Sequence, residues 1–101
     1  MIRVSVMYVN EPGKNFNWDY YLNKHLPMVH RLLDPLGLVR SEIDKAADSS
    51  APFIAVGHLI LNSMEDCRNS FLDPTYFNEI AADVVNYTDA PAQMQISEII
   101  K

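Results

Sequence analysis

The stretch FIAVGHLIL, residues 53–61, constrains the fold more than any other part of the sequence. It has the length of one strand, and side chains along a strand alternate between two faces. One face carries Ile54, Val56, His58 and Ile60, and the other carries Phe53, Ala55, Leu59 and Leu61. A strand that is apolar on both faces needs a covering layer on each side. The rest of the chain must supply both covering layers, or another molecule must supply one of them.

The remaining pattern predicts two helical regions and four strands in the order βαββαβ. Alternation of apolar and polar residues predicts strands at 2–9, 38–46, 53–61 and 91–99. Helical spacing predicts a first helix from Asn17, its expected cap, to the DPLG stop at 34–37. A weak cap at Ser63 and a stronger one at Asp73 predict the second helical region. This order is typical of a ferredoxin-like α+β fold with a four-stranded antiparallel sheet, and residues 1–101 form one domain.

Two helices can cover only one face of such a sheet, so the second face needs another cover. A second copy of the same sheet is the most economical answer, because homodimers with twofold symmetry are the commonest assembly. We therefore expect a homodimer in which the two sheets face each other and enclose a barrel-like interior. The interior between the two sheets could hold a small apolar molecule.

Charge and composition argue against several partners. Eight basic and thirteen acidic residues give a net charge of −5, which disfavours nucleic acid and anionic membrane surfaces. Cys67 is the only cysteine and cannot form an intramolecular disulfide. No apolar run approaches the ~20 residues of a membrane span, and the N-terminus lacks signal-peptide features. We expect a soluble cytoplasmic protein.

His25 is the most informative polar residue. It falls on the apolar face of the first predicted helix, together with Trp18, Tyr21, Leu22, Val29 and Leu32. Pro27 removes a helical hydrogen bond and can kink the helix, which would aim the imidazole into a cavity. We predict that His25 faces a cavity between this helix and the inner sheet face, with Tyr21 one turn earlier. A core histidine bonded to a backbone carbonyl is the alternative.

Further residues are candidates for the same site. His58 lies where packing does not call for a histidine, and a pocket or a core position suits it equally. The catalytic candidates are therefore His25, Tyr21 and His58, with Tyr21 or Tyr8 donating a hydrogen bond to a ligand carbonyl. The expected ligand-binding residues are Tyr8, Trp18, Met28, Val29 and Phe53.

No metal or cofactor is expected. His30 follows His25 by five residues, about 140° around the helix, so the two cannot act as paired ligands on one face. The three glycines at 13, 37 and 57 form neither a phosphate loop nor a dinucleotide fingerprint. Cys67 shares a helical stripe with Met64 and Phe71 and is predicted to be a core residue.

Two motifs resemble a known family. The segment NEPGKNFNWDYYLNKHLPMV contains Asp-Tyr-Tyr, then Lys-His and Pro, and Asn-Tyr-Thr-Asp at 86–89 precedes the last strand. Over essentially the whole chain the sequence resembles the EthD family of the dimeric α/β-barrel superfamily. Val9 departs from the pattern, since relatives often carry proline there.

The resemblance implies a ferredoxin-like homodimer with a pocket between sheet and helices. Some relatives look like cofactor-free lactone isomerases, or decarboxylases and dehydratases of polyketides. Others come from ether-degradation clusters in which a cytochrome P450 system looks to perform the oxidation. Two hypotheses follow: a cofactor-independent enzyme with His25 as acid or base, or a non-catalytic binding or helper protein for a partner oxidase. Haem binding through His25 or His58 is a third.

Overall fold

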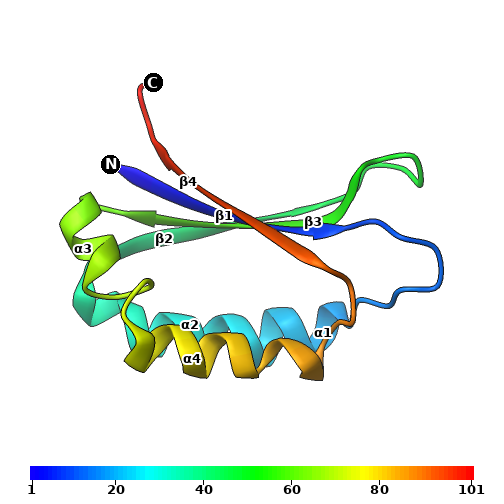
Figure 1. The fold of residues 1–101 in the computed structure, drawn as a ribbon, viewed down its shortest axis with the longest axis horizontal. Helices are drawn as coiled ribbons and strands as arrows, with labels where there is room; N and C mark the ends of the chain where they lie inside the picture. Colours follow the sequence, from blue (N-terminus) through cyan, green and yellow to red (C-terminus); the bar gives the residue numbers. More distant parts are fainter.

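The computed structural model describes all 101 residues and has the predicted ferredoxin-like topology. Four strands form an antiparallel sheet, and the helices lie along one of its faces (Figure 1). The elements in chain order are β1 (Ile2–Val9), α1 (Trp18–Tyr20), a π-helical turn (Tyr21–His25), α2 (Leu26–Leu33), a 3-10 turn (Asp34–Leu36), β2 (Leu38–Lys45), β3 (Phe53–Leu61), α3 (Met64–Arg68), α4 (Pro74–Ala82), a 3-10 turn (Val84–Asn86) and β4 (Ala92–Glu98).

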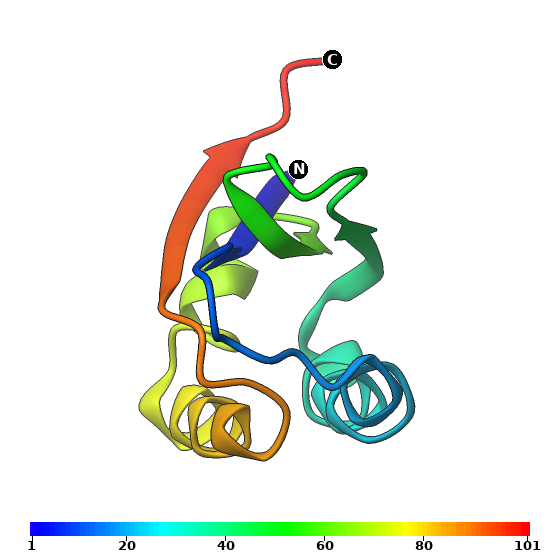
Figure 2. The same cartoon turned by 90° about the vertical axis from the view of Figure 1, so that its right-hand side faces the viewer.

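The sheet has the order β2-β3-β1-β4, so β1 and β3 are its central strands. All neighbouring strands run antiparallel. Viewed along the sheet, α2 and α4 lie side by side beneath it (Figure 2). None of the helices is long and apolar enough to cross a membrane.

The first helical region contains a widened turn that the sequence pattern did not predict. The Asn17 side chain caps it by accepting a hydrogen bond from the Tyr20 backbone N–H. The Leu26 N–H then donates to the carbonyl of Tyr21, five residues earlier, which makes a π-turn. A regular turn would force the Pro27 ring against the carbonyl of Asn23, so the widening relieves that clash.

The widened turn changes which residues are buried. The buried stripe is Tyr21, His25, Val29 and Leu33, with a spacing of four residues. Leu22, which regular helical spacing predicted to be buried, is 43% exposed. That prediction was wrong because the extra residue in the turn rotates Leu22 away from the sheet.

The predicted ends of the other helices are confirmed. Ser63 caps α3 by accepting from the Asp66 N–H, and Asp73 caps α4 by accepting from the Thr75 N–H. Gly37 ends the first helical region in the left-handed conformation, with φ of 110°. These local signals fix where each helix begins and ends.

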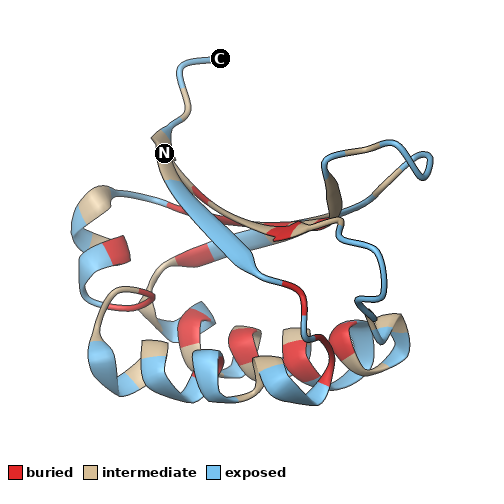
Figure 3. Cartoon of the chain, turned by 45° about the vertical axis from the view of Figure 1, so that its right-hand side comes forward, coloured by how far each residue is buried: buried red, intermediate tan, exposed pale blue.

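Buried residues occur in both the sheet and the helices (Figure 3). Most of the buried hydrophobic residues form two clusters between these layers. The larger cluster is mainly aliphatic and includes Val4, Leu33, Leu61 and Cys67. The smaller cluster is aromatic and consists of Tyr8, Tyr21, Tyr87, Ala55 and Ala90. The aromatic cluster brings three phenol groups to one end of the molecule.

The face of the sheet away from the helices is less apolar than β3 alone suggested. Strand register places on it Arg3, Ser5 and Met7 of β1, Arg40, Glu42 and Asp44 of β2, Val56, His58 and Ile60 of β3, and Gln93, Gln95 and Ser97 of β4. Apolar residues are confined mainly to β3. Ile60 is fully buried within the single chain, with Arg3 and Arg40 as its neighbours across the strands. The homodimer stays a prediction.

Candidate active site

A cavity of about 250 Å³ lies between the inner sheet face and the helices α2 and α4. Fourteen of its 17 lining residues are hydrophobic, among them Val6, Leu59, Phe77 and Ile80. The volume lies below the roughly 300–1,000 Å³ typical of sites for drug-sized ligands. The size and lining of the cavity therefore suit a small and largely apolar molecule.

Four of the residues singled out from the sequence line this cavity: Tyr8, Tyr21, His25 and Val29. The other four lie elsewhere. Trp18 packs on Phe16, with ring centroids 4.6 Å apart, and Met28 borders a groove on the outer side of the helices. Phe53 begins β3 opposite Val9. His58 lies on the opposite face of the sheet, so it does not share a site with His25.

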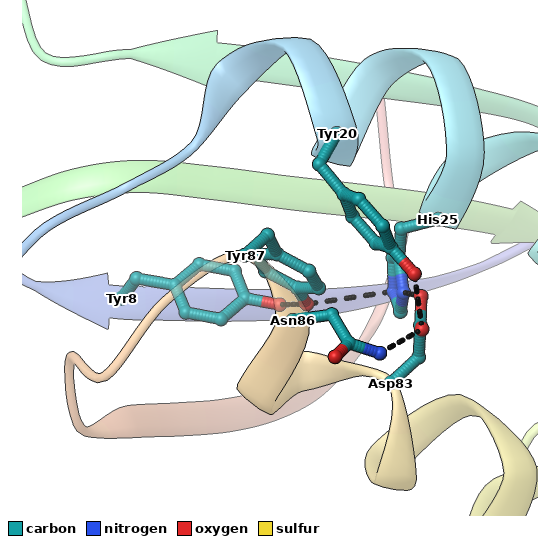
Figure 4. Close-up of polar contacts among 6 residues, drawn as sticks. All are labelled: Tyr8, Tyr20, His25, Asp83, Asn86 and Tyr87. Carbon is teal, nitrogen blue, oxygen red and sulfur yellow. Dashed lines mark hydrogen bonds and ion pairs between the residues drawn. The ribbon is translucent and has the colours of Figure 1, made fainter.

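His25 is held by Asp83 from the end of α4. The Nδ1 atom of His25 lies 2.9 Å from Oδ2 of Asp83 (Figure 4). The other carboxylate oxygen accepts from the Tyr20 hydroxyl at 2.7 Å and from the Asn86 side-chain amide at 2.9 Å. An ionised carboxylate can only accept, so Nδ1 carries the proton and Nε2 is left with its lone pair.

The Nε2 atom of His25 faces the hydroxyl of Tyr87, which in turn bonds to Tyr8. Tyr87 Oη lies 3.4 Å from it, a long hydrogen bond, and 2.5 Å from the hydroxyl of Tyr8 (Figure 4). The His25 and Tyr87 rings are 4.6 Å apart at their centroids. A row of polar side chains therefore runs from Tyr8 through Tyr87 and His25 to Asp83. All of them except Asp83 line the cavity.

Burial sets the protonation states in this row. Burial lowers the pKa of His25 below its ordinary value of 6.5, although the Asp83 carboxylate opposes that shift. Burial alone would raise the pKa of Asp83, but the hydrogen bonds from Asn86, Tyr20 and His25 together lower it. Burial also raises the pKa of Tyr8, Tyr21 and Tyr87. At neutral pH the site thus combines a neutral imidazole, a carboxylate and protonated phenols.

Sequence reasoning did not find Asp83 or Tyr87. Asn86 and Tyr87 belong to the Asn-Tyr-Thr-Asp motif, which supported the family resemblance but suggested no role for them. A usable signal was the spacing, since Asp83 precedes Tyr87 by four residues, as Tyr21 precedes His25. Residues four apart on an α-helix share a face, and although residues 84–86 form a 3-10 turn, Asp83 and Tyr87 both contact His25.

Comparison with known protein families shows to which family the chain belongs. The model of the EthD domain family matches residues 14–91, which is most of the chain. The chain belongs to the EthD family. An EthD-like protein from Ralstonia eutropha JMP134 is 32% identical and superimposes with a TM-score of 0.83, over 99% of this chain and 92% of that one. No curated protein matches the chain.

More distant structures share the fold of this EthD protein. An EthD family protein from Bacillus halodurans C-125 is 14% identical, with a TM-score of 0.75 over 99% of both chains. SnoaB, a cofactor-independent oxygenase from Streptomyces nogalater, is 11% identical, with a TM-score of 0.65 over 99% of this chain and 92% of its own. At such identities the likeness establishes the fold and no more.

Proposed function

We propose that this EthD protein binds a small apolar carbonyl compound in the cavity and moves a proton with His25, without a resident cofactor. One observation carries the proposal: a neutral imidazole that is bonded to Asp83 at Nδ1 lines an apolar cavity, and its Nε2 atom has only a long contact to Tyr87. A general base works best when its pKa lies near the operating pH and its proton-accepting atom can reach the substrate.

The proposed step is removal of a proton from the carbon next to a carbonyl group. The C–H electron pair becomes the enolate, Nε2 of His25 takes the proton, and Asp83 stabilises the imidazolium. A phenol of the cavity donates a hydrogen bond to the enolate oxygen. If a carbon–carbon double bond follows the deprotonated carbon, return of the proton to the far carbon of that bond shifts the double bond and isomerises the substrate. If a hydroxyl group stands on the next carbon, it leaves as water with the proton from the imidazolium, which is a dehydration. An enolate is also compatible with the cofactor-independent oxygenation named for SnoaB.

Deuterium uptake by a model ketone tests this step. β-Tetralone is a small apolar ketone with acidic hydrogens beside its carbonyl, and its exchange in D₂O can be followed by NMR. Wild-type protein should accelerate the exchange, and His25→Asn should lower the rate by roughly 10²–10⁴-fold. His30→Asn is the matched control, because both nitrogens of this more exposed histidine are already bonded, to Asp34 and Ser41. Equal rates for wild type and His25→Asn would contradict the proposal.

A non-catalytic binding protein is the second candidate function. The observation that favours it is that His25, Tyr8 and Tyr87 already satisfy one another inside the protein. In that case His25→Asn would lower the melting temperature while the folded fraction still binds β-tetralone without exchange.

An absorption spectrum of purified protein, with and without added haem, tests haem binding.

We further propose that the active form is a homodimer joined through the outer sheet face. Met7 and Val56 are half-buried apolar residues of that face, with charged residues of both signs around them. Val56→Asp should convert the dimer to a monomer in sedimentation measurements, because a carboxylate would be buried without a partner. A monomeric wild-type protein at micromolar concentration would contradict this assembly.

A further inference from the structure

Gly57 occupies the middle of β3, on the inner face, where it forms part of the cavity wall. Glycine weakens a strand interior, because it loses more conformational freedom than other residues and offers no side chain to pack. Only Gly13 and Gly37 have positive φ angles, so the backbone does not require glycine at position 57. The reason for this glycine must lie in the space beside it.

That space is filled by the hydroxyl of Tyr21. A Cβ atom at position 57 would overlap with Tyr21 Oη. The next nearest atoms, Cδ1 of Ile43 at 3.7 Å and Cζ of Tyr21 at 3.8 Å, would be in ordinary contact with it. The Tyr21 hydroxyl is therefore the one group whose position depends on the missing side chain.

The Tyr21 hydroxyl is unusual among the phenols of the site. Tyr8, Tyr20 and Tyr87 each hydrogen-bond to another side chain, whereas no group of the chain bonds to Tyr21 Oη. Buried polar groups normally have a partner. The only side-chain nitrogen or oxygen that is both sealed from solvent and unpartnered is Nε of Arg3, so Tyr21 Oη remains accessible although its residue is only 4% exposed. The cavity is the space that it borders.

We propose that Gly57 is a positioning residue for Tyr21. Its missing side chain lets the Tyr21 hydroxyl rest against the sheet and donate a hydrogen bond to an oxygen atom of the ligand. This contact makes the cavity prefer carbonyl compounds over hydrocarbons of the same shape. The inference rests on the proposed function in taking a small carbonyl compound as the ligand.

The test compares wild type with Gly57→Ala, Tyr21→Phe and the double variant. Two probes are used: β-tetralone and its analogue with an exocyclic methylene in place of the carbonyl oxygen. Wild type should bind β-tetralone more tightly by roughly two- to tenfold, the range of one hydrogen bond. Each single variant should lose this preference, and the double variant should lose no more than Tyr21→Phe does.

Thermal melting tests the coupling without any ligand. Gly57→Ala should lower the melting temperature, and adding Tyr21→Phe should restore most of the loss because the overlapping oxygen is gone. Adding Tyr20→Phe instead is the matched control and should restore nothing, since the Tyr20 hydroxyl bonds to Asp83.

Three results would overturn the inference: a Gly57→Ala variant that keeps the preference, a double variant that is no more stable than Gly57→Ala, or a Tyr21→Phe variant that still discriminates between the probes. Discrimination by wild type without deuterium exchange would overturn the proton transfer and leave the role of Gly57 standing. Failure of both probes to bind wild type would overturn both proposals.

Discussion

Two histidine–aspartate pairs with the same distance between nitrogen and oxygen lie on opposite faces of the sheet. His25 meets Asp83 at 2.9 Å on the inner face, and His58 meets Asp44 at 2.9 Å on the outer face. The exposed side-chain fractions differ: 6% and 18% for the inner pair, 19% and 66% for the outer pair. Distance alone therefore does not distinguish a candidate catalytic pair from a surface pair.

The second ring nitrogen separates the two pairs. In His58 both nitrogens are occupied, because Nδ1 lies 2.9 Å from the Ser5 hydroxyl. In His25 the second nitrogen has only the long contact to Tyr87 and borders the cavity. A base needs a fixed orientation and a lone pair that a substrate can reach, and only the inner pair combines a weakly bonded second nitrogen with an apolar cavity. The following predictions test this contrast.

Removal of the aspartate should have the largest effect. Asp83→Asn should lower the rate of β-tetralone exchange by about 10²-fold or more, because the imidazole loses the group that fixes its tautomer and stabilises its charged form. Asp44→Asn should change the rate by less than about twofold. Equal losses in the two variants, measured by the same NMR exchange, would show that the pairs are not functionally distinct.

The exchange rate and the stability should both depend on pH through the protonation of His25 in the inner pair. Because the pKa of His25 is lowered on folding, the exchange rate should be constant around neutral pH and fall about tenfold per pH unit below that pKa. Stability should change with pH in the same direction. Protonation of His25 favours the unfolded chain, so the free energy of unfolding falls as the pH drops below 6.5 and levels off below the pKa of His25 in the folded protein. Chemical denaturation at several pH values should show this loss in His58→Asn and not in His25→Asn.

The smallest predicted contrast concerns one hydroxyl group in the hydrogen-bond network of each histidine. Tyr8→Phe removes a buried hydrogen bond to Tyr87 and should lower the free energy of unfolding by about 1 kcal/mol. Ser5→Ala removes a half-buried contact to His58 that water can replace, so its cost should be below about 0.5 kcal/mol. Urea denaturation measures both values, and a larger loss for Ser5→Ala would reverse the comparison.

Most of the fold could be predicted because its signals are local. Alternation located the strands, and Asn17, Ser63 and Asp73 act as the expected caps. The π-turn was not predicted, because its widening depends on how the helix relieves the Pro27 clash, and several local distortions can do so. Leu22 was misplaced for that reason.

The candidate site was less predictable, because its residues come from different elements. The helical stripe placed His25 and Tyr21 on the buried face, but Asp83 and Tyr87 meet them only through the packing of α2 against α4. The polarity of the outer sheet face was harder still to predict. An apolar pattern in β3 carries no information about Arg3, Arg40 or Gln95 on the neighbouring strands, and these determine how polar that face is.

Because of the π-turn, the proposed function also depends on the number of residues between Tyr21 and His25. Each residue of a helix adds about 100° of rotation, so deleting one residue between Tyr21 and His25 would remove the widening, turn Tyr21 relative to His25 and bring back the clash at Pro27. The helix would keep its composition and its caps, yet Tyr21 would swing off Gly57 while Val29 and Leu33 stayed in the core. A one-residue gap at exposed Asn23 would then be more damaging than substitution of that same side chain.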